Sequence, residues 1–144
     1  MKVRAGVQNS FGSHRVSLQT NDERHDIVIA PKTTGFGSNI NGGELLFLAL
    51  ATCYCNDIYR EAVKRGIVVE QVEVTVEGDF PAEGAPATNV SYRAKVVADA
   101  SEDAIRSLML ETDRVAEIQN TLRTQTPVNL SEIEAVSVQS QAKT

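Results

Sequence analysis

At 144 residues the chain is long enough for one ordinary domain, and we expect residues 1–144 to form a single domain. Its composition, 42% hydrophobic and 23% charged, is typical of a soluble globular protein and excludes disordered or collagen-like chains. The formal net charge of -5 repels phosphate backbones, so nucleic acid is not an expected partner.

The N-terminal third predicts antiparallel strands. Strand-like runs occupy residues 2–8, 14–20 and 27–30, and the turn-forming pairs Asn9-Ser10 and Asn21-Asp22 come directly after the first and the second run. Residues 31–43 are rich in Gly, Thr, Ser and Asn, which predicts a loop that leads into a helix.

Residues 44–65 predict one long helix, because they contain no Gly or Pro and are followed by Gly66. The first half of this helix is apolar on nearly all sides, so it must be covered all round. A single sheet in so small a chain covers one side only. We therefore expect another helix or a second copy of the chain on the other side, which favours a homodimer.

Alternating valines over residues 67–79 and a similar alternation over residues 90–96 predict a long hairpin. Ser101 is a suitable cap for the next helix, and the apolar residues from Ile105 to Leu122 fit one curved helix or two short ones. Residues 133–139 predict a final strand. The fold class is therefore α+β, with helices on one face of antiparallel sheets.

Cys53 lies in the middle of the apolar helix and is either a small buried hydrophobe or a redox thiol. Cys55 follows two residues later, about 200° around the helix, so the two thiols point apart and do not form a redox couple. His14 and His25 have no Cys or carboxylate near them at a metal spacing. We expect neither a metal nor a cofactor.

The first ten residues, MKVRAGVQNS, contain no apolar segment behind their basic residues, which argues against a secretory signal and favours a cytoplasmic protein. The longest apolar run, residues 45–55, is about half the length of a membrane span. A membrane is therefore not an expected partner.

The run from Gly43 to Cys53, GELLFLALATC, resembles the ELLLAALGGC signature of the OsmC/Ohr family, the osmotically induced and organic hydroperoxide resistance proteins. The segment from Gly66 through the alternating valines and the later Thr126-Pro127-Val128 are also similar to that family. The resemblance implies an OsmC-like α+β fold in an intertwined homodimer, with a long buried central helix from each copy packed between antiparallel sheets.

The resemblance also implies a thiol-dependent peroxidase in which Cys53 attacks an organic or hydrogen peroxide. By this resemblance Arg15 is the candidate for the residue that lowers the thiol pKa, and Glu44 for the residue that orients the arginine. The family's glutamate aligns either with Glu44 or with the position one residue earlier, Gly43. The family's second, resolving cysteine falls at Ala116, so an external thiol reductant has to complete the cycle.

Glu44 also has an ordinary structural interpretation as a favourable charge at a helix N-terminus, and Arg15 as a solvated strand residue. The alternative function is a non-catalytic dimer of the same fold, which binds an apolar small molecule at the dimer interface and has Cys53 simply packed.

Overall fold

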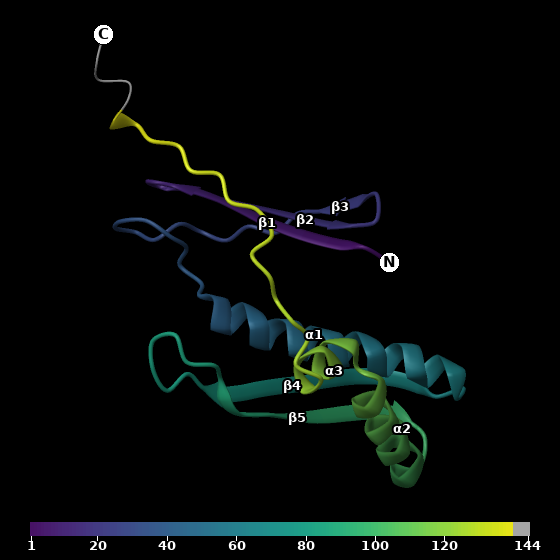
Figure 1. The fold of residues 1–144 in the computed structure, drawn as a ribbon. Helices are drawn as coiled ribbons and strands as arrows, with labels where there is room; N and C mark the ends of the chain where they lie inside the picture. Colours follow the sequence, from purple (N-terminus) through teal and green to yellow (C-terminus); the bar gives the residue numbers. More distant parts are fainter. Residues whose placement is uncertain (140–144) are drawn as a thin grey trace.

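The computed structural model describes residues 1–139 and has two parts (Figure 1). The first is an antiparallel sheet, called here the N-terminal sheet, of β1 (Val3–Ser10), β2 (Ser13–Thr20) and β3 (Glu23–His25) in that order. The second, the main body, comprises α1 (Gly42–Lys64), the β4 (Val68–Asp79) and β5 (Thr88–Asp99) hairpin, α2 (Glu102–Val115) and α3 (Glu117–Arg123). The α+β class with antiparallel sheets and one long helix is confirmed.

The third strand of the N-terminal sheet is not where the sequence pattern places it. A strand predicted over residues 27–30 is wrong, because β3 covers Glu23–His25 and residues 26–30 form no strand. The turn at Asn21-Asp22 closes with Thr20 paired to Glu23, so the hydrogen-bonded ladder starts directly after the turn. Turn geometry, rather than the first apolar run, sets the register of this strand.

α1 starts two residues before its predicted beginning because Asn41 caps it. The Asn41 side chain accepts a hydrogen bond from the Glu44 backbone N–H at 2.9 Å, and the Glu44 carboxylate accepts one from the Asn41 N–H at 2.8 Å. This reciprocal pair satisfies two helix N–H groups that would otherwise lack partners. The helix ends at Lys64, just before Gly66, whose φ of 65° suits the left-handed conformation.

One face of the β4–β5 hairpin packs against α1 and forms the core with it. Val72 pairs with Val96 and Val74 with Ala94, and these side chains lie against a buried cluster. The cluster consists of Tyr54, Ile58, Ala62 and Leu108. α2 supplies Leu108, so the two helices and the hairpin bury one common set of apolar side chains.

The segment after Ser101 forms two short helices, α2 and α3, rather than one curved helix. Ser101 caps α2 by accepting a hydrogen bond from the Ala104 N–H at 3.2 Å, as its position predicts. The helices are separated at Ala116, which is fully buried and has an extended backbone, with φ of -67° and ψ of 112°. This break redirects the chain so that α3 begins beside α1.

The final strand predicted over residues 133–139 is wrong. Residues 126–137 form an arm without helix or strand, and apolar side chains along it are exposed, including Val136 at 80%. Alternating apolar residues form a strand only where another strand supplies hydrogen-bond partners. Within the described residues no strand pairs with this arm.

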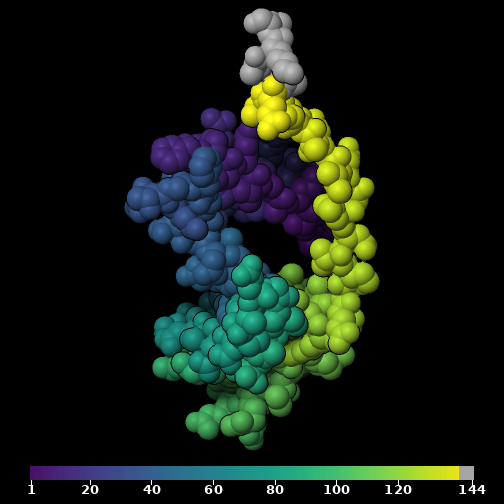
Figure 2. Space-filling model, turned by 60° about the vertical axis from the view of Figure 1, so that its left-hand side comes forward, coloured from purple at the N-terminus to yellow at the C-terminus, as the bar shows by residue number. Residues whose placement is uncertain are grey.

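The N-terminal sheet lies apart from α1, and Figure 2 shows an opening between this sheet and the main body. Apolar side chains on both parts are exposed, Val7 at 65% on β1 and Leu48 at 54% on α1. The main body therefore covers one side of α1, whereas the other side has open apolar surface. No helix among residues 1–139 combines the length and the apolar character needed to cross a bilayer.

Truncation of the buried leucine of α2 should destabilise the fold. Leu108→Ala removes a fully buried side chain and leaves a cavity, so we expect the free energy of unfolding to fall by about 2–5 kcal/mol. The matched control is Leu110→Ala on the same helix, where the side chain is 68% exposed and the change should stay within about 0.5 kcal/mol. Urea denaturation followed by circular dichroism measures both, and equal losses would contradict the described core.

Candidate functional site

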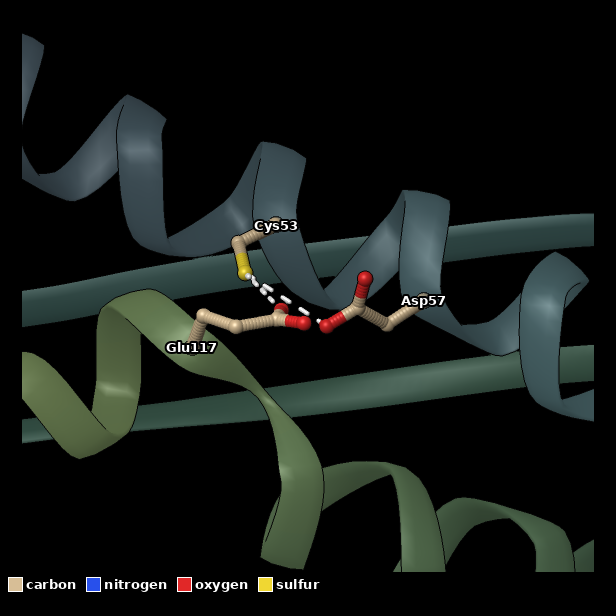
Figure 3. Close-up of side chains that lie close together, drawn as sticks. All are labelled: Cys53, Asp57 and Glu117. Atoms are coloured by element: carbon tan, nitrogen blue, oxygen red, sulfur yellow. Dashed lines mark hydrogen bonds between the residues drawn. The ribbon is translucent and has the colours of Figure 1, made fainter. Parts of the chain in front are cut away.

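The thiol of Cys53 lies between two carboxyl groups (Figure 3). Its Sγ is 3.5 Å from Oδ2 of Asp57, one turn further along α1, and 3.7 Å from Oε2 of Glu117, the first residue of α3. Asp57 is buried, with 5% exposure, whereas the Glu117 side chain is 62% exposed. Cys53 itself is half-buried, so the thiol meets the carboxyl groups at the edge of the main body.

Arg60 binds the second oxygen of both carboxyl groups. Its Nη1 lies 3.0 Å from Oδ1 of Asp57 and 2.9 Å from Oε1 of Glu117. The same guanidinium donates through Nε to Glu61 at 3.0 Å, and Lys64 pairs with Glu61 at 2.8 Å. Each of the two carboxyl groups thus has one oxygen on the guanidinium and one directed at the sulfur. We call Cys53, Asp57, Arg60 and Glu117 the thiol cluster.

The surroundings of Cys53 disfavour its thiolate. Burial raises the pKa of the Cys53 thiol most, a hydrogen bond from the backbone at Ile118 lowers it, and the charges of Asp57 and Glu117 raise it further. An arginine next to the sulfur would have the opposite effect. In this chain the guanidinium of the cluster is that of Arg60, and it contacts the carboxyl groups rather than the sulfur.

The two carboxyl groups differ in how readily they hold a proton. Burial, together with the hydrogen bond and charge of Glu117, raises the pKa of Asp57, while Arg60 opposes that rise. The pKa of Glu117 is lowered, first by its own backbone amide and then by Asp57 and Arg60. When the pair holds one proton, that proton therefore resides on Asp57, the buried member.

The single chain does not bring the three sequence-predicted site residues together. Arg15 is exposed on β2, opposite Gln8, in the sheet that lies apart from α1. Among residues 1–139, no hydrogen bond or ion pair joins Arg15 to Cys53 or to Glu44. Glu44 takes part in the capping box of α1, more than two turns before Cys53.

Sequence reasoning missed Asp57, Arg60 and Glu117. The spacing of Cys53 and Asp57, four residues apart on a helix, places the two side chains on one face and could have identified the first pair. Arg60, three residues after Asp57, follows the same rule. No local signal indicates Glu117, because it reaches the sulfur from a helix that is 64 positions away in the sequence.

Cys53, Asp57 and Glu117 have ligand atoms within 4.8 Å of one another, a spacing compatible with a metal ion. However, the Arg60 guanidinium already binds one oxygen of both carboxyl groups and supplies the positive charge there. We therefore assign no metal to this cluster. The second cysteine, Cys55, lies on a different side of α1, where it borders a shallow depression together with Val74 of β4. Both cysteines are free thiols.

Ala116 occupies the position at which the resemblance places a resolving cysteine. Its side chain is fully buried between α2 and α3 and has no redox chemistry. The next residue, Glu117, directs its carboxylate to the Cys53 sulfur instead. The helix that the resemblance expects to supply a second sulfur therefore supplies a carboxyl group, and this group lies beside the Cys53 thiol.

Comparison with known proteins gives a consistent fold assignment. The sequence model of the OsmC-like protein family matches residues 35–131, a stretch that contains Cys53 and Glu117 but not Arg15. The chain is similar to the solved structure of an OsmC-like protein from Mycoplasma pneumoniae, at 16% identity and a TM-score of 0.58, over 83% of this chain and 87% of the other. It is also similar to an OsmC-like protein of unknown function from Vibrio cholerae, at 13% identity and a TM-score of 0.53, over 82% of this chain and 92% of the other. At these identities the two structures support the fold alone, and no curated protein matches the chain.

Removal of one negative charge should make Cys53 more reactive. Glu117→Gln keeps the shape of an exposed side chain and deletes a charge 3.7 Å from the sulfur, so we expect the pKa of the Cys53 thiol to fall. The measurement is the pH dependence of iodoacetamide alkylation in a Cys55→Ser background. Glu111→Gln, which removes a carboxylate paired with Arg114 on α2, serves as the matched control and should leave the profile unchanged.

Proposed function

Because the chain belongs to the OsmC-like protein family, we propose that it reduces organic or hydrogen peroxides through the thiol of Cys53. The observation that carries the proposal is the position of this thiol, which is free, half-buried and within hydrogen-bond distance of two carboxyl groups. A thiolate attacks the peroxide O–O bond and becomes a sulfenic acid. The carboxyl groups offer a place for the proton that the thiol loses.

The cycle needs an external reductant. Ala116 carries no sulfur, and Cys55 borders a different surface of α1 from the one that Cys53 faces. A low-molecular-weight thiol therefore condenses with the sulfenic acid and releases water, which leaves a mixed disulfide on Cys53. A second thiol molecule attacks this disulfide and restores the Cys53 thiol, with the two reductant molecules joined as a disulfide.

The working form is a homodimer. Three surfaces of the chain have exposed apolar side chains, namely the N-terminal sheet, one side of α1 and the arm after α3, represented by Val7, Leu48 and Val136. A small sheet with an open apolar face is not stable by itself in water, and extended apolar surface marks an interaction site. A second copy of the chain would cover all three surfaces and give an apolar approach to Cys53 for alkyl peroxides.

In this dimer, Arg15 of one copy lies beside Cys53 of the other and stabilises its thiolate. The thiol cluster and its neighbour Glu61 place three carboxyl groups around Arg60 and Lys64, so a thiolate there lacks a cation of its own. Arg15 is exposed on a sheet that its own main body does not cover. Glu44 uses Oε2 in the capping box, and its second oxygen orients the incoming guanidinium.

A second candidate function is the non-catalytic dimer that binds an apolar small molecule at its interface. The observation that favours it is the raised pKa of Cys53, which suits a packed thiol better than a nucleophile. The two functions differ in what peroxide does to the sulfur, since only the first oxidises it.

Loss of the sulfur should abolish the reaction. We expect Cys53→Ser to stop peroxide consumption in the presence of a dithiol reductant, while light scattering still gives the mass of two copies. Cys55→Ser is the matched control and should retain activity. Mass spectrometry after brief peroxide treatment should locate one added oxygen on Cys53. Unchanged turnover in Cys53→Ser, or a sulfur that stays unmodified in the wild type, would favour the binding protein.

If Arg15 comes from the second copy, two inactive variants should restore activity when they are combined in one dimer. Arg15→Ala and Cys53→Ser are each expected to be inactive as homodimers, for different reasons. When the two variants are unfolded and refolded together, mixed dimers contain one site with an intact Cys53 and an intact Arg15. Peroxide consumption should then return in part. If the mixture stays as inactive as its components, Arg15 does not act across the dimer.

A further inference from the structure

We propose that Asp57 is the proton carrier of the Cys53 reaction, with Glu117 as the residue that keeps the proton on it. The inference rests on the proposed peroxidase function and adds two residues to it. Asp57 would accept the thiol proton before the attack on peroxide and return it to the leaving oxygen afterwards.

The geometry of the thiol cluster supports a proton transfer between sulfur and carboxyl group. Arg60 binds Oδ1 of Asp57 at 3.0 Å, and Oδ2 of the same group lies 3.5 Å from Sγ. Glu117 is bound in the same way, with Oε1 on Arg60 at 2.9 Å and Oε2 at 3.7 Å from Sγ. The oxygens that Arg60 does not bind therefore converge on the sulfur, as Figure 3 shows.

Charge balance explains why this pair can accept the proton that leaves the thiol. Two carboxylates that meet at one point repel each other, and the single guanidinium that they share also holds Glu61. The proton that arrives from the thiol relieves this repulsion. Asp57 is the member that receives it, because its side chain is buried and that of Glu117 is open to water.

The charged groups that face Asp57 come from two elements. Cys53 and Arg60 face it from α1, and Glu117 faces it from α3. Burial and Glu117 raise the pKa of Asp57, and Arg60 lowers it. A carboxyl group whose pKa is moved towards neutrality exchanges its proton with a thiol more effectively than an ordinary one.

The reaction balances with these groups. The S–H bond of Cys53 breaks and its proton passes to the ionised Asp57, which leaves a thiolate. The thiolate attacks the outer oxygen of an alkyl hydroperoxide, so that an S–O bond forms while the O–O bond breaks. The departing alkoxide takes the proton from Asp57, and the products are a sulfenic acid on Cys53 and one alcohol. The sulfur is oxidised and the peroxide reduced by one electron pair.

The test compares two electrophiles on the same sulfur in a Cys55→Ser background. Iodide leaves without a proton, whereas alkoxide is a strong base that needs one. In Asp57→Asn we expect faster alkylation by iodoacetamide at pH 7, because a nearby negative charge is lost. Oxidation of Cys53 by cumene hydroperoxide should fall by about 100-fold, the usual contribution of a general acid or base.

The pH profile gives a readout that a merely structural role would not move. For the unmutated cluster the rate of peroxide reaction should be bell-shaped, with an acidic limb from the carboxyl pair and an alkaline limb from the thiol. Asp57→Asn should lose the acidic limb and show only the rise with thiolate. Glu117→Gln should keep a bell whose acidic limb lies at lower pH, because Asp57 then has no carboxylate partner.

The outcomes separate the inference from the function on which it rests. If alkylation and peroxide oxidation both rise in Asp57→Asn, the carboxyl groups merely repel the thiolate and Asp57 carries no proton, although the peroxidase stands. If unmutated Cys53 does not react with peroxide, the proposed function fails and the inference with it. Glu111→Gln should match the unmutated protein in both reactions. If Asp57→Asn does not fold, the exposed Glu117→Gln decides, and an acidic limb that does not move overturns the proposal.

Discussion

The structure depends on the need to cover α1, a helix that is apolar on nearly every side in its first half and partly charged in its second. The β4–β5 hairpin and α2 cover one side, where Ile58 and Leu108 are fully buried. Burial of that side orients the whole helix, because a helix with one buried face has no remaining freedom to rotate. The direction in which Cys53 and Asp57 point follows from this packing.

The second consequence concerns α3. The backbone turns at the buried Ala116, and α3 then returns along α1 with its first residue, Glu117, beside the sulfur. Gln119 strengthens this contact by donating to the backbone oxygen of Leu50 at 3.0 Å. Ala116, where the resemblance implies a resolving cysteine, is therefore also the residue at which the chain turns into α3, and the adjacent Glu117 carboxyl group reaches Cys53 from the same break.

The same packing explains why the thiol environment differs from the one that the resemblance implies. The resemblance implies a cation beside the sulfur, whereas the single chain places two carboxyl groups there and uses its arginine to hold them. These descriptions are compatible if the cation comes from a second copy, because the main body leaves one side of α1 open and the N-terminal sheet uncovered. The reactivity of Cys53 then reflects a balance of charges across two chains.

The sequence by itself determined the elements whose signals are local. Alternating valines define β4, and the run of residues 44–65 without Gly or Pro defines the body of α1, since both depend on residues within a few positions of one another. The helix begins at Gly42, two residues earlier than this run indicates, because Asn41 caps it. The position of Cys53 on that helix was also predictable. Tertiary structure alone decided that Glu117 meets Cys53 and that residues 133–139 form no strand. These features depend on which distant segments of the chain come together. A segment's own sequence has no periodic pattern that shows which hydrogen-bond partners or charges the rest of the fold will place beside it.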